Sequence, residues 1–147
     1  MPVKELKMSE YISKTLRDAV WERASGCCEY CRIHNEDSFY SHEVDHIIPK
    51  KHGGKSAIDN LALACYFCNR YKGADIGSVD PITRNFARFF NPRTQKWEEH
   101  FKIAGGRIIP LTPTGKVTAI ILKLNNPKRI VERELLIKLG YYPRSKF

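Results

Sequence analysis

Two pairs of cysteines constrain this chain more than any other feature. Cys28 and Cys31 form one CxxC pair and Cys65 and Cys68 form the other, with 33 residues between the pairs. Two such turns can present four thiolates to one ion, and four sulfur ligands in a tetrahedron suit zinc and leave no coordination position open for chemistry. The sequence therefore predicts a structural zinc site. Buried or redox-active thiols are the alternative, which two separate pairs in a short chain disfavour.

The 33 residues between the pairs exceed the roughly 15–20 residues of a compact zinc ribbon, so they must form a folded insert. Phe39–Ile48 has the composition of a strand, Lys50–Asn60 is a basic loop with two glycines, and Leu61–Ala64 is a second short strand. A helix is predicted over Phe67–Lys72. Strand, loop, strand and helix in this order indicate an α+β fold around the metal.

Several polar motifs follow one another in this insert. They are Asp45-His46-Ile47-Ile48-Pro49, Gly53-Gly54, Asn60-Leu61 and the second CxxC pair followed directly by Asn69. In this order, the stretch from Cys28 to Gly73 resembles the cysteine-containing branch of the HNH endonuclease family. The resemblance covers about a third of the chain. It implies a zinc-stabilised ββα-metal core that cleaves DNA.

The resemblance also implies a role for each matching residue. His46 matches the general base of the family, and Asn60 matches the residue that fixes the loop and orients that base. Asp45 and Asn69 match the two ligands of a catalytic divalent ion. Asn69 stands where the family usually has histidine, and oxygen ligands favour Mg²⁺ or Mn²⁺ as that ion.

Elementary chemistry agrees with these roles. Imidazole, with an unperturbed pKa of about 6.5, can take a proton from water near neutral pH. A cation can neutralise the charge that develops on the phosphate, provided that coordination positions stay open. Neighbouring residues of a regular strand point to opposite faces, so Asp45 and His46 can face one point only if the strand bulges or ends there.

A net charge of +9 favours a polyanionic partner. The excess lies in the second half, because residues 1–80 carry 11 basic and 12 acidic side chains, whereas residues 81–147 carry 14 and 4. Around the expected active site, the basic side chains suited to phosphate contacts are Lys50, Lys51, Lys55, Arg70 and Lys72. We therefore expect DNA to be bound mainly through its phosphates.

The shift in charge coincides with a predicted boundary between an HNH domain, residues 1–78, and a basic C-terminal α/β extension, residues 79–147. In the extension we expect a hairpin over Trp97–Leu111, a helix over Val117–Leu124 and a helix from Pro127 to Gly140. Its aromatic side chains should be mostly buried and should pack the extension on the nuclease unit, since neither piece alone buries much core.

The apolar stretches are far shorter than the roughly 20 residues that cross a bilayer, so no membrane span is expected. Met1–Glu10 lacks the apolar core of a secretory signal, which favours a cytoplasmic location. Two other functions stay open: a non-catalytic zinc-dependent DNA-binding module, and a zinc scaffold that binds protein partners. The first would retain DNA without cutting it. The second would bind DNA weakly and without dependence on salt.

Overall fold

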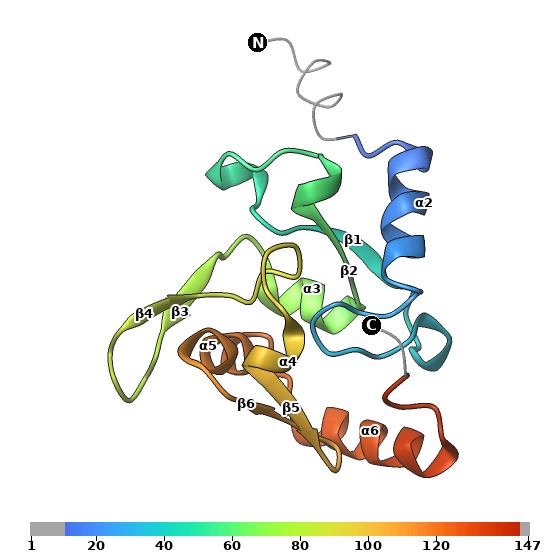
Figure 1. Ribbon diagram of the computed structural model, residues 1–147, viewed down its shortest axis with the longest axis vertical. Coiled ribbons are helices and arrows are strands. Elements are labelled where there is room, and N and C mark those ends of the chain that lie inside the picture. The colour runs from blue at the N-terminus through green and yellow to red at the C-terminus, as the bar shows by residue number, and fades with distance from the viewer. Residues whose placement is uncertain (1–10, 145–147) are drawn as a thin grey trace.

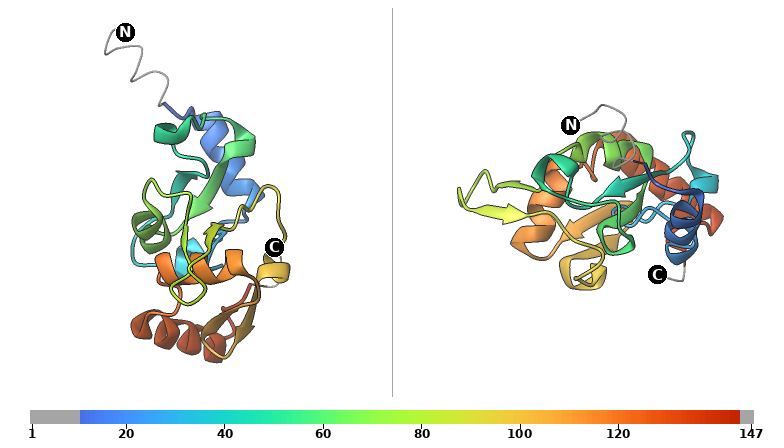
Figure 2. Two further views of the ribbon diagram at one scale, coloured as in Figure 1. Left: turned by 90° about the vertical axis from the view of Figure 1, so that its left-hand side faces the viewer. Right: turned by 90° about the horizontal axis from the view of Figure 1, so that it is seen from above.

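A computed structural model describes residues 11–144 of the protein (Figure 1). Met1–Glu10, the segment without the pattern of a secretory signal, lies outside the described residues. Helices and short antiparallel strand pairs alternate along the described chain, so the predicted α+β class is confirmed. Figures 1 and 2 show helix α2 and the loop of residues 47–60 at one end of the long axis, with the last hairpin and helix at the other.

The elements of the described chain are short. The helices are α2 (Lys14–Arg23), α3 (Tyr66–Lys72), α4 (Trp97–His100), α5 (Pro113–Ile121) and α6 (Pro127–Leu139). The strands form three antiparallel pairs: β1 (Glu43–His46) with β2 (Leu61–Ala64), β3 (Gly77–Val79) with β4 (Phe86–Arg88), and β5 (Phe101–Ala104) with β6 (Arg107–Pro110). Three 3-10 turns are η1 (Asn35–Asp37), η2 (Lys50–His52) and η3 (Ile58–Asn60).

The β1–β2 pair lies between two helices. Alternation along β2 turns Leu61 and Leu63 toward α2, where they pack with Val20. Ala62 and Ala64 face the other way, into the cluster that contains the cysteines and the start of α3. All four residues of β2 are fully buried. The small pair of strands is therefore covered on both faces, which gives the loop that joins them a firm base.

Two of the predicted elements in this half differ from the structure at their ends. The strand predicted over Phe39–Ile48 is confined to β1, because β2 offers only four partners and the segment before β1 carries exposed rings. Helix α3 begins one residue earlier than predicted: the Cys65 side chain accepts a hydrogen bond from the Cys68 N–H and so caps the helix. The strand–loop–strand–helix order is confirmed.

The C-terminal half contains the predicted hairpin and both predicted helices, with two changes. Helix α5 covers Pro113–Ile121 and not Val117–Leu124, because Thr112 caps it and Pro113 begins its first turn. Trp97, expected to begin a strand, begins α4 instead, and β5 starts only at Phe101. Glu98 and Glu99 in the first turn of α4 suit the positive end of a helix. Helix α6 follows the prediction, with Asn126 capping its start and Gly140 at its end.

The β3–β4 hairpin has no counterpart in the prediction. Each strand has only three residues, too few for an alternation of apolar and polar side chains to show in the sequence. A β-carbon at Gly77 would lie 2.4 Å from the Ala87 carbonyl oxygen, so this pairing requires glycine. The boundary expected after residue 78 lies within β3.

One apolar cluster spans both halves of the chain. It contains the four paired cysteines and Tyr30 from the first half. From the second half it includes Phe89, Phe90, Trp97, Phe101, Ile108, Leu122, Leu124, Leu136 and Tyr142. Most aromatic side chains of the extension are thus buried as expected, although Phe86 is 59% exposed. The indole N–H of Trp97 donates to the Tyr30 carbonyl at 2.8 Å, which links the two halves directly.

Candidate functional site

The four paired cysteines form a closed sulfur cluster. Their Sγ atoms all lie within 4.8 Å of one another, and all four side chains are buried. Sulfurs bound to one zinc ion at about 2.3 Å lie ~3.8 Å apart in a tetrahedron, and Cys31 Sγ and Cys65 Sγ are 3.6 Å apart. In each CxxC turn the N–H of the second cysteine donates to the sulfur of the first at 3.4 Å. These residues fit a structural zinc ion.

Cys27 is a buried fifth cysteine that does not belong to the four-sulfur cluster. Its backbone forms an isolated bridge with His34, which closes the turn that carries Cys28 and Cys31. Cys27 is therefore a structural residue of this turn and not one of the four clustered sulfurs.

An arginine from the far end of the chain completes the surroundings of the sulfurs. Arg129, in the first turn of α6, donates from Nη2 to Cys68 Sγ at 3.1 Å and to Cys65 Sγ at 3.7 Å. Its Nη1 donates to the carbonyls of Leu122 and Lys123. Four thiolates and one Zn²⁺ would carry a net charge of −2, which this guanidinium reduces. Sequence reasoning missed Arg129, because nothing local marks a partner 61 residues from Cys68.

Asn60 fixes the loop between β1 and β2. Its side-chain amide donates to the carbonyls of Ile48 and Lys55, each at 2.9 Å, and its Oδ1 accepts from the Ile48 N–H at 2.9 Å. Gly54 permits this close crossing, since a β-carbon there would lie 1.6 Å from the Ile48 carbonyl oxygen and 2.9 Å from the Asn60 amide. One side chain therefore holds the loop at two residues, Ile48 two residues after the end of β1 and Lys55 further along.

His46 is the last residue of β1, directly before the segment that Asn60 fixes. Its Nε2 lies 2.9 Å from the hydroxyl of Ser56 in the same loop. Ser56 orients the imidazole, and it is a second residue that sequence reasoning missed. The serine lies between the glycine pair and Asn60, where a hydroxyl gives no signal that separates it from an ordinary loop residue.

Asp45 points to the other side of β1 and is 5% exposed. Its carboxylate accepts a hydrogen bond from the Tyr30 hydroxyl at 2.9 Å and forms an ion pair with Lys72 at 3.2 Å. Burial raises the pKa of Asp45, against the opposing effects of the Lys72 ammonium and the Tyr30 hydroxyl. The expected metal ligand is thus already neutralised by a lysine.

Lys72 corrects one of the predictions. It was expected to contact DNA phosphates, but it is 1% exposed, and its Nζ also donates to the His46 carbonyl at 2.9 Å. The last turn of α3 aims this side chain inward, under β1, where solvent and DNA do not reach it. The spacing of basic residues could not reveal this, because the direction depends on how α3 packs.

Asn69 lies beside Glu43. The Asn69 amide donates to a Glu43 carboxylate oxygen at 3.0 Å, and both side chains are half-buried. Glu43 and Asp45 are two residues apart on one strand, so both face α3. The two-residue spacing of Glu43 from Asp45 is the sequence signal that both side chains lie between β1 and α3.

Strand β1 thus separates the expected catalytic residues into two groups. Its register with β2 is unbroken through His46, which is also its last residue, so the structure shows a strand end and no bulge at this point. His46 faces the loop and Ser56, whereas Asp45 and Glu43 face α3, with Lys72 and Asn69. Among residues 11–144, no cluster of three His, Cys, Asp or Glu side chains other than the four cysteines is placed to hold a metal.

Comparison with known proteins identifies this segment. Residues 28–75 match the family model of the HNH endonucleases, which covers the cysteine pairs, both strands and α3. Residues 28–75 are an HNH domain. No curated protein and no solved structure matches the chain. This segment is therefore similar to a family of nucleases that bind nucleic acid.

The other basic residues expected at the HNH domain's DNA surface lie outside the core. Lys51, Lys55 and Arg70 are exposed and Lys50 is half-buried. Turn η2, which carries Lys50 and Lys51, is tied to the end of α3 because His52 Nε2 lies 3.1 Å from the Ala74 carbonyl oxygen. The basic loop and the basic end of α3 therefore border one surface.

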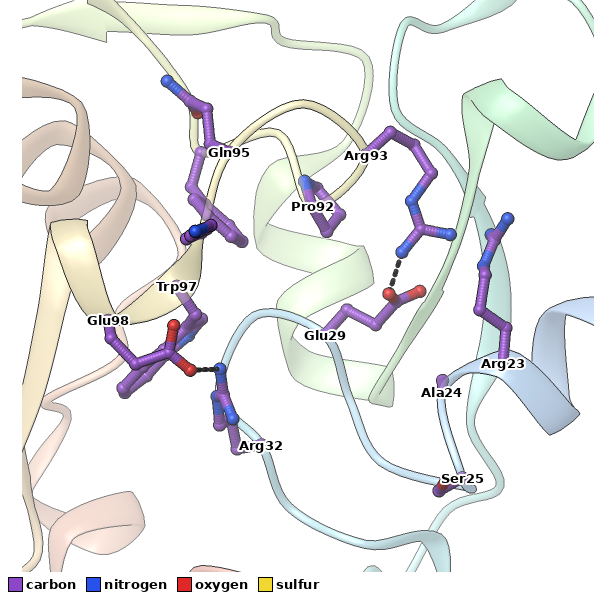
Figure 3. A pocket seen from close by; sticks show the side chains of 12 residues that line it. Arg23, Ala24, Ser25, Glu29, Arg32, Pro92, Arg93, Gln95, Trp97 and Glu98 are labelled. Carbon is purple, nitrogen blue, oxygen red and sulfur yellow. Dashed lines mark hydrogen bonds and ion pairs between the residues drawn. The ribbon is translucent and has the colours of Figure 1, made fainter. Parts of the chain in front are cut away.

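A cavity of about 660 Å³ lies beside the HNH domain, where the end of α2 and the first cysteine turn meet residues 90–98 (Figure 3). Two ion pairs border it, Arg93 with Glu29 and Arg32 with Glu98. Arg23 donates to the backbone carbonyls of Ile58 and Leu61. None of the expected catalytic residues lines this cavity, so it is a junction between the HNH domain and the extension.

No helix in the part of the chain that the structure describes is long and apolar enough to span a membrane.

Proposed function

We propose that the protein is an HNH endonuclease that hydrolyses DNA phosphodiester bonds, with His46 as the general base and the four cysteines holding a structural zinc ion. The observation that carries this proposal is the loop fixed by Asn60. Two of its hydrogen bonds hold Ile48, two residues after His46, a third holds Lys55 in the same loop, and Ser56 contacts the imidazole. A base must be held in this way to meet a water molecule in a productive geometry.

The arrangement on the two sides of β1 supports an in-line displacement. In such a step the attacking water and the leaving oxygen lie on opposite sides of the phosphorus atom. His46, on one side, would take a proton from the water as its oxygen bonds to phosphorus and the bond to the leaving oxygen breaks. Glu43 and Asn69, on the α3 side, would face the leaving oxygen across the end of the strand.

The side chains between β1 and α3 offer oxygen atoms, which are the ligands that Mg²⁺ and Mn²⁺ prefer. Asn69, Glu43 and Asp45 would hold such an ion, which when bound neutralises charge on the phosphate and on the leaving oxygen. At Asp45 the ion has to compete with the Lys72 ammonium. We therefore expect weak binding of the ion in the absence of DNA, with phosphate oxygens completing its coordination.

The basic surface supports DNA as the substrate. Lys51, Lys55 and Arg70 would contact phosphates near the cleavage point, and the extension of residues 79–147 would lengthen the contact with its excess of basic side chains. Affinity that depends on phosphate neutralisation falls steeply with salt. A protein-binding scaffold would show weak DNA binding without that dependence.

Plasmid cleavage tests this proposal. Wild type, His46→Ala and His100→Ala are compared in EDTA, Mg²⁺, Mn²⁺ and Zn²⁺. His100→Ala is the control, because it removes an imidazole from α4, outside the HNH domain. Loss of a general base lowers rates by about 10²- to 10⁴-fold, so we expect that loss in His46→Ala alone, with DNA affinity and zinc content unchanged. Undiminished cleavage by His46→Ala would contradict the assignment of His46 as the general base.

A non-catalytic DNA-binding module is the second candidate, and the Asp45–Lys72 ion pair favours it, since a neutralised carboxylate is a poor cation site. It would be supported if the wild type binds DNA but does not cut it with any divalent ion.

Comparing Glu43→Gln with Asp45→Asn identifies the acid that holds the ion: the variant that needs more Mg²⁺ for half-maximal cleavage has lost the ligand.

A further inference from the structure

Helix α3 has two chemically different faces. Its inner face carries Cys68 and the buried Lys72, and Cys65 caps its start. Its outer face is made of Tyr66, Phe67, Arg70 and Tyr71, which lie one helical turn apart in pairs. Three aromatic rings and an arginine on the outside of a seven-residue helix are not needed to bury the helix.

Two more rings extend this outer face. Phe39 and Tyr40, in the segment before β1, reach α3: the Tyr40 ring stacks on Tyr66 with 4.3 Å between centroids and meets Phe67 edge-on at 6.4 Å. Phe39 packs edge-on against Tyr40 at 5.0 Å. We call these residues the aromatic patch: Phe39, Tyr40, Tyr66, Phe67 and Tyr71.

The aromatic patch is open to solvent. Phe39 is 93% exposed, Tyr40 46% and Phe67 41%. Contiguous exposed apolar groups on a folded protein mark a binding surface. The patch borders the proposed catalytic residues, since Phe67 and Arg70 lie on either side of Asn69 in α3 and Tyr40 precedes Glu43 by three residues.

Cations lie over the same rings. The Arg70 guanidinium lies 4.5 Å from the Tyr66 ring centroid, and the Lys123 ammonium lies 4.8 Å from that of Tyr71. Within residues 11–144, neither cation forms an ion pair with an acidic side chain. Exposed rings combined with cations that lack an acidic partner complement a ligand that has both flat faces and negative charge. Nucleic acid with unpaired bases is such a ligand.

We propose that the aromatic patch is a stacking platform for unpaired bases, and that the preferred substrate of the HNH domain is DNA with a single-stranded or frayed segment beside the cleaved bond. This inference rests on the proposed nuclease function for its link to cleavage. In paired DNA the base faces are covered by their neighbours, so rings such as Phe39 and Phe67 can stack only on bases that have left the duplex. Lys51 and Arg70 would hold the adjoining phosphates.

The test measures binding in EDTA, where cleavage is absent. The probes are a single-stranded oligonucleotide of about 15 nucleotides that carries 2-aminopurine, and a duplex of the same sequence. The variants are Phe39→Ala and Phe67→Ala, with Phe67→Trp as the conservative replacement. Phe86→Ala is the matched control, because Phe86 is a 59% exposed ring on β4 outside the patch.

We expect wild type to bind the single strand more tightly than the duplex and to change the 2-aminopurine fluorescence by stacking. Phe39→Ala and Phe67→Ala should each weaken single-strand binding by about 5- to 100-fold, with duplex binding nearly unchanged. Phe67→Trp and Phe86→Ala should bind like wild type. All the substituted side chains are at least 41% exposed, so the fold should persist, and circular dichroism checks this.

Three results would overturn the proposal: single-strand binding that survives loss of either ring, equal losses for single strand and duplex, or a change in molecular mass by light scattering that shows the rings joining two copies of the chain. Failure of the nuclease function is recognised separately, in the plasmid assay. If the wild type cuts no DNA but Phe67→Ala loses single-strand binding, the stacking platform is supported and the nuclease function is rejected.

Discussion

The cysteine cluster and the polar side chains between β1 and α3 both collect ligating groups around α3, yet their charges are balanced in different ways. Four thiols converge in the cluster, with the Arg129 guanidinium beside them. Between β1 and α3, Asp45 forms an ion pair with Lys72, and Glu43 accepts a hydrogen bond from the Asn69 amide. Four thiolates would need a divalent ion to balance their charge, whereas Asp45 already has a cation as its partner. We therefore expect the cluster to depend on its ion, and the site between β1 and α3 to admit an ion only in competition with Lys72.

Removing the metal from the cluster should give the largest effect. Structural zinc contributes roughly 10–16 kcal/mol of apparent binding free energy in small zinc domains, which is as large as the whole stability of most domains, about 5–15 kcal/mol. A strong chelator or Cys68→Ser should therefore unfold the shared core, as measured by circular dichroism and zinc content. Cys27→Ser, which changes a buried cysteine outside the cluster, should keep its zinc. A chelated protein that melts like wild type would contradict this.

Breaking the ion pair between Asp45 and Lys72 should have the next largest effect. Lys72→Met leaves Asp45 buried without its cation, and such losses cost about 3–5 kcal/mol. Urea denaturation measures the change, and Asp45→Asn combined with Lys72→Met should recover part of it. Mg²⁺ should also raise the melting temperature of Lys72→Met more than that of wild type. Equal effects of Mg²⁺ on both proteins would show that the lysine does not compete with the ion.

Arg129 tests whether the cluster depends on the extension. Hydrogen bonds to charged groups contribute about 1.5–3 kcal/mol, so Arg129→Gln should lower the free energy of unfolding by that order and weaken zinc retention in a chelator competition. Lys128→Ala is the control, since this exposed neighbour in α6 touches no sulfur. If Arg129→Gln holds zinc like wild type, Arg129 stabilises the fold through its hydrogen bonds to the Leu122 and Lys123 carbonyls and not through the sulfurs.

His42 should give the smallest effect, and one that depends on pH. Its Nε2 lies 2.9 Å from the Ile33 carbonyl oxygen, which can only accept, so Nε2 carries the proton. Its Nδ1 is buried without a hydrogen-bond partner. Burial lowers the pKa of His42 in the folded protein, so the unfolded chain takes up a proton first as the pH falls. The contribution of His42 to the free energy of unfolding should therefore decrease below about pH 6.5, the ordinary pKa of histidine.

Urea midpoints between about pH 5 and pH 7.5, which bracket that pKa, measure this slope. His42→Gln should flatten it, because an amide does not titrate in this range. Glu29, whose pKa is raised to about 7 by burial, titrates in the same range with the opposite effect on stability, so the difference in slope between wild type and His42→Gln isolates His42. A difference of the opposite sign would mean that protonated His42 is accepted in the fold, against the placement of its Nδ1.

Most elements were predictable where their signals are local. Caps and stops identify α2 and α6, since Ser13 and Asn126 are good caps and Gly140 adopts the left-handed conformation that ends a helix. The β5–β6 turn follows from its glycine pair. The β3–β4 hairpin and α4 could not be predicted in this way. Strands of three residues are too short to show an alternation of apolar and polar side chains. Trp97 has the composition of a strand residue, and its place in α4 goes with a distant hydrogen bond from its indole to the Tyr30 carbonyl.

The sequence by itself determined the sulfur ligands, the order of strand, loop, strand and helix, and the segment that matches the HNH family, because spacing along the chain fixes each of them. Only the tertiary structure decided where the charges go. The fold buries Lys72 against Asp45, brings Arg129 to the sulfurs and leaves the rings of α3 outside. These contacts join residues tens of positions apart, and their geometry depends on how helices pack on a strand pair, which local spacing does not encode.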